Sequence, residues 1–482
     1  METTNAFLST LLGNGDRGGE YLNATTTPLL VSALAVAVAM VIRVQQKSSS
    51  TSNRKTPKPA DAQIPPHVHS WIPFVGSAVA MGQNGIAHFV ISKAKALAET
   101  QKTGTQNSGR VPVFTATILG DKCLFIADPA DLMAAVFGAR IQKYLDVVSL
   151  QKQFVKNCLG ATTAEIDFMF APDVMKASVP LYHHYLFKGQ QLEQSMARVQ
   201  EYFHQWIPSV VDATGDWKRY NLYDLVGEAV FKASTGPFLS DICPKSETVY
   251  SNFRAFDQGV IALFNSVPPF LLKSTIAARD SLLNLVKSKD FWTQASPLMH
   301  DRRELLVRDS LSEEALDRAN LGLLWASSGN SIPAVFWMLA RLLEDPVAWR
   351  ACVDQVKEIM AKRTDASSSG FTLDELDQMT LLESSFWEAL RLYQANITAR
   401  KVVQDFCFET ASGQKYWITK GTKIMAYWEV LHRDPHVHDS PLEFRYDRFV
   451  DKDKVYKFAS GKTLTHGPVV PFGGGSHLCP GR

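Results

Sequence analysis

The stretch PFGGGSHLCPGR, residues 471–482, places a single cysteine in a glycine-rich loop at the end of the chain. Phe472 precedes Cys479 by seven residues, and Pro480 and Gly481 follow the cysteine directly. Glycine lets a backbone approach a bulky group closely, and backbone N–H groups directed at a sulfur atom hold it as the thiolate. The pattern predicts a cysteine that acts as a ligand. The alternative is a surface loop with an incidental buried thiol.

This stretch resembles the FxxGxxxCxG signature of the cytochrome P450 family, with Phe472, Gly475, Cys479 and Gly481 at its four defined positions. The resemblance is specific, because four fixed residue types within ten positions seldom coincide. It implies the cytochrome P450 fold, which is mainly α with small β-sheets. It also implies haem b as the cofactor and Cys479 as the axial ligand of the haem iron. The phenylalanine and the two glycines are then residues that contact the haem.

A second motif, ExxR at Glu388 and Arg391, lies in an amphipathic helix predicted over residues 381–393. Side chains three residues apart share one helix face, so an exposed ion pair is the simplest interpretation. The resemblance implies more: the pair meets Arg448, from the segment PLEFRYDRF at 441–449, in a buried triad with a structural role. A glutamate buried between two guanidinium groups is tolerated only when its hydrogen bonds are complete.

Two basic residues are candidates for binding the haem propionates. Arg400 lies nine residues beyond Arg391, where the family brings a basic side chain toward the cofactor, and His477 lies two residues before Cys479. For both side chains, simple exposure to solvent is the alternative. The Trp-x-x-x-Arg motif that the family usually carries on an earlier helix is absent between residues 130 and 240, so one propionate partner stays unassigned.

Residues 321–339, LGLLWASSGNSIPAVFWML, predict a long apolar helix interrupted at Gly329 and Pro333. Breaks in a central helix often mark a ligand site. Most members of the family place an acid–threonine pair here for proton delivery, whereas this chain has Gly329 and Asn330. With Trp325 and Pro333, these residues resemble the subgroup that contains sterol 7α- and 12α-hydroxylases and prostacyclin synthase. We expect Gly329 and Asn330 to act in catalysis; a kinked core helix without a ligand role is the alternative.

The resemblance implies a haem-thiolate monooxygenase that hydroxylates a lipophilic substrate, a sterol or another lipid, with O2. The chain has no flavin or nicotinamide motif, so the electrons are expected from NADPH–cytochrome P450 reductase. The subgroup leaves open a reductase-independent isomerase of a lipid endoperoxide or hydroperoxide. The chain also stops three residues after Cys479, where the family continues with a helix and strands. We therefore expect a longer enzyme, with a non-catalytic haem- or lipid-binding fragment as a further alternative.

The N-terminal part of the sequence predicts a membrane anchor. Residues 29–42 are apolar except for Ser32, and with their flanks they reach about 20 residues, which as a helix span roughly 30 Å. Basic residues predominate after this run and place the following part in the cytosol; a cleaved signal peptide is the alternative. The expected location is the endoplasmic reticulum membrane, crossed once. The predicted order is a lumenal N-terminus (1–24), a transmembrane helix (25–44), a flexible linker (45–64) and the catalytic domain (65–482).

Composition excludes one class of partner. The net charge of +2 argues against binding nucleic acid. The six cysteines are scattered without a CxxC pair, which predicts free thiols in a reducing compartment. The adjacent residues His183 and His184 diverge by about 100° on a helix and cannot bind one metal ion together. Two apolar runs, 260–264 and 267–272, are either ordinary core or a segment that dips into the bilayer.

The hydrophobic pattern also predicts where the regular elements lie. Residues 113–119 and 122–127 read as a hairpin around a Gly-Asp turn. From 131 to 362, apolar residues recur at three- and four-residue spacing, which predicts helices. Short strands are expected at 399–407 and 423–427. The absence of alternating strands and helices indicates a predominantly α fold.

Overall fold

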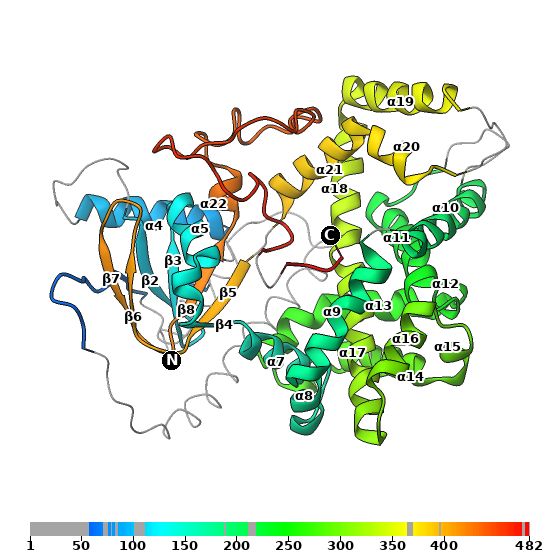
Figure 1. Cartoon of the computed structure of the whole chain (residues 1–482), viewed down its shortest axis with the longest axis horizontal. Coiled ribbons are helices and arrows are strands. Elements are labelled where there is room, and N and C mark those ends of the chain that lie inside the picture. The colour runs from blue at the N-terminus through cyan, green and yellow to red at the C-terminus, as the bar shows by residue number, and fades with distance from the viewer. Residues whose placement is uncertain are drawn as a thin grey trace, which may run out of the picture.

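The chain forms a β-sheet with a few helices beside it and a larger group of helices (Figure 1). The C-terminal segment, red in Figure 1, lies between these two regions. The expected mainly α fold with small sheets is therefore confirmed. The computed structural model describes residues 57–70, 76–78, 80–81, 85–100, 111–187, 189–210, 218–363, 370–394, 397–474 and 478–481.

The six-stranded sheet is built from distant parts of the chain. In spatial order its strands are β1 (His67–Val68), β2 (Val113–Ile118), β3 (Asp121–Ile126), β8 (Lys423–Tyr427), β5 (Ile397–Val402) and β4 (Leu145–Asp146). β2 and β3 form the predicted antiparallel hairpin, in which Val113 pairs with Ile126. Leu119 and Gly120 at its turn have φ angles of 46° and 77°, the geometry of the tight turn that suits twisted strands. β8 joins the sheet parallel to β3 and antiparallel to β5.

A separate two-stranded sheet pairs β6 (Phe406–Glu409) with β7 (Lys415–Ile418). The strand expected at 423–427 is confirmed as β8, and the range 399–407 contains the end of β5 and the start of β6. β7 has no counterpart in the sequence-based prediction, because four residues carry little periodicity. The end of the predicted linker lies against this sheet. Gln63 bridges to Tyr416, and Ala62 is buried. The fold therefore holds the chain from about Ala62 onward.

Three helices pack on the larger sheet: α4 (Ile86–Thr100), α5 (Pro129–Phe137) and α22 (Glu429–His432). Pro129 begins α5 with the backbone angle that a first helical turn needs, and the Asp128 side chain caps it by accepting two backbone N–H groups. The core between α4 and the sheet is aromatic. Phe114 and Phe125 stack with ring centroids 5.5 Å apart, and Phe89 packs against both.

The second region contains the helices predicted between 131 and 362. They are α7 (Val148–Asn157), α8 (Thr163–Met169), α9 (Pro172–Leu186), α10 (Gln190–Val210), α11 (Leu222–Phe238), α12 (Ile242–Lys245), α13 (Glu247–Phe264), the 3-10 helix η1 (Pro269–Leu271), α14 (Lys273–Lys287), α15 (Lys289–Thr293) and α16 (Pro297–Leu306), whereas α6 (Ala139–Gln142) packs on α5 and β4 beside the sheet. Their shared core contains the buried rings of Phe231, Phe253 and Phe256. α13 and α14 pack so closely at Gly259 that a Cβ on this residue would lie only 2.2 Å from the Thr275 hydroxyl oxygen.

The long apolar helix expected at 321–339 is two helices, α17 (Ser310–Gly329) and α18 (Ser331–Glu344). The break lies at Asn330, directly after Gly329. Pro333 lies in the first turn of α18 and has no N–H to donate to the Gly329 carbonyl four residues earlier, so the proline favours the break at this place. The predicted interruption of the apolar helix is confirmed as a single break at Asn330, between the two residues that predicted it.

Three further helices follow, α19 (Pro346–Ala361), α20 (Leu373–Gln378) and α21 (Thr380–Tyr393), and α21 matches the helix predicted at 381–393. The C-terminal segment after α22 has no further helix or strand among its described residues. None of the helices in the described ranges has both the length and the apolar character needed to span a bilayer. The predicted anchor, residues 25–44, lies outside those ranges.

Candidate active site

Glu388 and Arg391 of α21 form a buried cluster with Arg448 of the C-terminal segment. The three residues are at most 5% exposed. Arg391 donates from Nε and Nη2 to the two carboxylate oxygens of Glu388, at 2.7 and 2.8 Å, and Arg448 Nε lies 2.9 Å from Glu388 Oε1. The structure therefore brings together the three residues that the resemblance assigned to a triad.

This cluster contains two positive charges and one negative charge, and backbone carbonyls balance the difference. Arg391 Nη1 donates to the carbonyls of His432 and Pro441 at 2.7 and 2.6 Å. Arg448 Nη1 donates to the carbonyl of Asp439 at 2.5 Å. Charge-assisted hydrogen bonds of this kind offset the lost hydration of a buried ion. The cluster thereby attaches α21 to the segment that leads to the cysteine loop.

The start of the cysteine loop is hydrogen-bonded to a buried histidine of α22, which no sequence motif indicates. His432, on α22, is fully buried, and its Nε2 accepts the backbone N–H of Val470 at 3.0 Å. Burial, assisted by the nearby Arg391 and Arg433 guanidiniums, lowers the pKa of His432 to about 3. The ring is therefore neutral at physiological pH and has a nitrogen free to accept this hydrogen bond.

The loop closes on itself beside α21. The backbone N–H of Cys479 donates to the carbonyl of Phe472 at 2.9 Å, and the Phe472 ring meets Trp387 of α21 edge-on, with centroids 5.9 Å apart. A Cβ on Gly481 would lie 4.0 Å from the Cys479 sulfur. The thiol is partly exposed, so it is accessible to a ligand while its backbone is held in place.

Arg400, on β5, is a desolvated cation with no carboxylate partner in the described part of the chain. It is 8% exposed, its Nη1 donates to the carbonyl of Ala399 at 3.0 Å, and its Nε has no partner among the described residues. Burial lowers the pKa of this guanidinium. An arginine in this state fits a bound carboxylate, such as a propionate. The other two predicted contacts in the loop, Gly475 and His477, lie outside the described residues.

The break between α17 and α18 carries the predicted distal residues. The side chain of Asn330 is exposed, and its Nδ2 lies 3.4 Å from the carbonyl of Ala326. On the neighbouring face, beside Gly329, Trp325 Nε1 donates to Asp257 of α13 at 2.9 Å. Asp257 lies 68 residues before Trp325 in the chain, and no sequence signal points to this pair.

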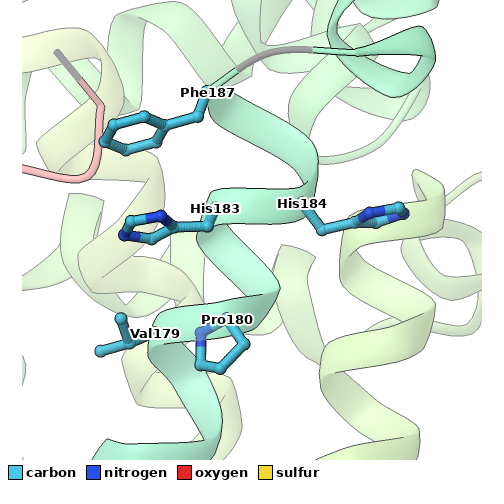
Figure 2. A pocket seen from close by; sticks show the side chains of 5 residues that line it. All are labelled: Val179, Pro180, His183, His184 and Phe187. Atoms are coloured by element: carbon cyan, nitrogen blue, oxygen red, sulfur yellow. The ribbon is translucent and has the colours of Figure 1, made fainter.

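A groove of about 620 Å³ lies along α9 and is lined by Val179, Pro180, His183, His184 and Phe187. His183 points to the same side as Phe187, and their rings stack with centroids 4.3 Å apart, whereas His184 points to the opposite side (Figure 2). The two histidines therefore do not converge on one metal ion, as their adjacency predicts. The described part of the chain holds no cluster of three or more metal-ligating side chains.

The model of the family described as Cytochrome P450 matches residues 184–482. The chain belongs to the cytochrome P450 family. As a P450 it is a monooxygenase with a cysteine-ligated haem. The residues in the structure fit that cofactor, since Cys479 has an accessible thiol in a closed loop and the buried Arg400 guanidinium has an unpartnered donor.

Known relatives of this P450 include enzymes named as sterol hydroxylases. It is 29% identical over 305 residues to 25-hydroxycholesterol 7-alpha-hydroxylase of Rattus norvegicus, covering 60% of this chain and 72% of the relative. It is 35% identical over 189 residues to 5-beta-cholestane-3-alpha,7-alpha-diol 12-alpha-hydroxylase of Sus scrofa, covering 38% of this chain and 37% of the relative. The predicted resemblance to 7α- and 12α-hydroxylases is thus confirmed. The solved structure of retinoic acid bound cyanobacterial CYP120A1 shares the fold, with a TM-score of 0.60, 17% identity, and coverage of 87% of this chain and 88% of that one.

Proposed function

We propose that this P450 hydroxylates a sterol or a closely related lipid, with O2 as the oxygen source and electrons from NADPH–cytochrome P450 reductase. The observation that carries the substrate class is the similarity to relatives named as 7-alpha- and 12-alpha-hydroxylases of cholesterol-type molecules. The helix pair α17–α18 supports it, because it carries the residues on which the subgroup resemblance depends, Trp325, Asn330 and Pro333.

In this proposal the C-terminal loop and β5 hold the cofactor. The contacts are Cys479 to the haem iron, and Phe472, Gly475, Gly481, His477 and Arg400 around the rest of the haem. Bound haem with a thiolate ligand supplies the activation of oxygen. Arg400 neutralises a propionate, and the triad of Glu388, Arg391 and Arg448 has a structural role, because it attaches α21 to the loop segment.

Asn330 and Gly329 belong to the distal side of the pocket. The exposed Asn330 amide is available to hydrogen-bond an oxygen of the substrate or an ordered water. Gly329 has no side chain to occupy the space beside Trp325, since even a Cβ there would contact the Trp325 indole at 3.4 Å. Gly329 therefore leaves room at the helix break, and Asn330 supplies a polar group that can orient the molecule bound there.

We also propose that residues 25–44 anchor the enzyme in the endoplasmic reticulum membrane. Residues 1–24 are then lumenal, 45–64 link the anchor to the fold, and the catalytic domain from residue 65 to 482 faces the cytosol. A lipophilic substrate dissolved in the bilayer supports this arrangement, since the enzyme then meets it at the membrane surface.

The carbon monoxide difference spectrum of the reduced protein tests the cofactor assignment. The Cys479→Ser variant is expected to lose the long-wavelength Soret band of a thiolate-ligated haem. The matched Cys407→Ser variant, at a partly exposed thiol on β6, should keep it. A full band in the Cys479→Ser variant would end the assignment.

Reconstitution with NADPH, the reductase and a panel of sterols tests the reaction. The expected result is a hydroxylated sterol whose new oxygen comes from labelled O2 and whose formation requires NADPH. Conversion of a lipid hydroperoxide without oxygen or NADPH, combined with no sterol hydroxylation, would replace this proposal by the isomerase.

A further inference from the structure

The carboxyl group of Asp257 lies against the break in the distal helix pair. Trp325 Nε1 donates to Asp257 Oδ1 at 2.9 Å. A Cβ built on Gly329 would lie 3.4 Å from that same carboxylate oxygen and 3.4 Å from the indole nitrogen. The Asp257 carboxyl group of α13 therefore lies beside Gly329, the last residue of α17, which has no side chain.

The distal helix pair cannot supply an acid at this place. Residues 321–339 contain no Asp, Glu, His, Lys, Arg, Tyr or Cys. The nearest side-chain atom to a Cβ placed on Gly329 is a carboxylate oxygen of Asp257, at the same distance as the Trp325 indole nitrogen. The break thus has a carboxyl group that comes from a neighbouring helix.

The environment of Asp257 favours a carboxyl group that binds and releases a proton. The residue is half-buried, and the Phe154 ring packs on Trp325 with centroids 4.8 Å apart, so the surroundings are largely apolar. Burial raises the pKa of the Asp257 carboxyl, while the Trp325 hydrogen bond and Arg254 lower it, and the net change is a rise.

A route to solvent leads away from the carboxyl group on the other side. Arg254 lies three residues before Asp257 on α13, and its Nη2 is 3.9 Å from Asp224 Oδ1 on α11. The Asp224 side chain is 66% exposed. The buried Ser328 hydroxyl, next to Gly329, has no hydrogen-bond partner among the described residues. Charged groups therefore lie between Asp257 and the surface, and a hydroxyl without a partner lies beside the helix break.

The proposed reaction consumes protons, and this inference depends on that proposed function. Hydroxylation of a C–H bond by O2 breaks the C–H and O–O bonds, forms a C–O bond and releases the second oxygen atom as water. The two electrons come from NADPH through the reductase, and the two protons that complete the water molecule come from solvent. A pocket lined by an apolar helix needs a group that passes these protons inward.

We propose that Asp257 is the proton-relay residue of this enzyme, held at the α17–α18 break by Trp325 and given room by Gly329. The carboxyl group takes a proton from the solvent side, near Arg254, and releases it toward the pocket. Trp325 is a positioning residue, because its indole N–H fixes one carboxyl oxygen and leaves the other to exchange the proton.

The decisive comparison uses the full-length chain loaded with haem in the Asp257→Asn variant. Asparagine keeps an oxygen acceptor for Trp325 but cannot release an acidic proton. We expect an unchanged carbon monoxide spectrum and sterol binding within about twofold of wild type. Product formed per NADPH should fall by about tenfold or more, with hydrogen peroxide released instead and a larger solvent isotope effect on hydroxylation. Asp257→Glu should restore part of the coupling, and Asp280→Asn, at an exposed carboxylate of α14, should behave as wild type.

A second measurement does not depend on turnover. The infrared difference spectrum between wild type and Asp257→Asn should contain the C=O stretch of a protonated carboxyl group, shifted in heavy water, at a pH above that at which an exposed aspartate is protonated. The pH at which this band appears depends on the charge of Arg254 on the same helix and on Asp224, which faces Arg254. Residues 321–329 of α17, which face Asp257, carry no charge. A band that appears only at the pH of an exposed aspartate would overturn the proposal.

Three outcomes separate the possible failures. Unchanged coupling in Asp257→Asn overturns the relay. Sterol binding that weakens by about tenfold or more with unchanged coupling also overturns it, and makes Asp257 a substrate contact instead. A wild-type enzyme that forms no NADPH-dependent sterol product ends the proposed function, and the infrared titration then still decides whether Asp257 holds an exchangeable proton.

Discussion

Glu388 is a buried carboxylate that faces two guanidinium groups. Without this carboxylate, two buried positive charges would have no negative partner. Each arginine also donates to backbone carbonyls, yet these partial charges do not replace a full negative charge. A buried ion pair is weak evidence for stability in itself, but removal of one partner leaves an uncompensated charge. Any substitution that removes the Glu388 carboxylate is therefore expected to destabilise the folded protein.

The Glu388→Gln variant tests this directly. We expect the free energy of unfolding to fall by about 3–5 kcal/mol, measured by urea denaturation of the purified protein. The matched control is Glu383→Gln on the same helix, whose exposed pair with Lys452 contributes about 0–1 kcal/mol. Equal losses in the two variants would contradict a special role for the triad.

The cysteine loop is an element whose path is set by close packing. Gly473 has a φ of 70°, and a Cβ on Gly474 would lie 2.5 Å from a ring carbon of Phe137. The Phe137 ring is itself stacked between Trp428 and His466, with centroids 5.4 and 4.3 Å away. The ring has little freedom to move aside, so the loop needs a residue without a side chain at position 474.

Gly474→Ala is therefore expected to displace the loop. We expect an unfolding free energy lower by about 1–3 kcal/mol and a reduced fraction of protein that binds haem, measured by denaturation and by absorbance. Gly467→Ala is the control in the same segment, since a Cβ there meets nothing closer than 3.8 Å. Phe137→Leu should rescue Gly474→Ala; a double variant as damaged as the single one would count against this explanation.

Elements differ in how well local sequence predicts them. The β2–β3 hairpin and α21 follow from short-range patterns, because their apolar faces and turn residues lie within a few positions of one another. β1 and β4 have two residues each, and their pairing comes from neighbours in the sheet rather than from their own periodicity. The break at Asn330 shows a related limit: Gly329 and Pro333 both predict an interruption, and only the backbone geometry shows that they flank one break.

At the scale of the whole molecule, buried neutral histidines couple stability to pH. Burial lowers the pKa of His432 and of His438 to about 3 in the folded protein, against 6.5 as the ordinary value. Below about pH 6.5 these two histidines bind protons in the unfolded chain but stay neutral in the folded chain. Their contribution to stability is complete above that pH and falls by about 1.4 kcal/mol per pH unit for each histidine as the pH drops toward 3.

The His432→Asn variant should weaken this dependence. Asparagine can still accept the Val470 N–H but cannot titrate, so the loss of stability between pH 7 and pH 5 should be smaller than in wild type. Urea unfolding at both pH values measures the difference between the two slopes. His436→Asn, at an exposed histidine nearby, is expected to keep the wild-type slope. An unchanged slope in His432→Asn would show that this ring does not titrate as described.

A second property of the whole molecule is its affinity for lipid. Ile261, in the last turn of α13, is 77% exposed and Phe270, in η1, is 62% exposed, whereas Val260 and Leu263 of the run 260–264 are buried. We expect a chain without residues 1–44 to keep measurable binding to phospholipid vesicles through these side chains. Flotation assays should show that Ile261→Asp with Phe270→Asp removes it. No binding by the shortened parent chain would refute the bilayer contact and leave this segment as ordinary surface and core.

The sequence by itself indicated the family, because Cys479 among its glycines matches the family signature, and it predicted Cys479 as the cofactor ligand. The same resemblance named the three residues of the structural triad: Glu388 lies one helical turn before Arg391, and Arg448 comes from the segment 441–449. It also located the break after Gly329. Only the tertiary structure decided which side chains meet across the chain. His432 lies 38 residues from Val470, and Asp257 lies 68 residues from Trp325. Contacts at such separations arise from packing of whole elements, which no local pattern contains. The burial that leaves the Nε of Arg400 without a partner among the described residues has the same origin.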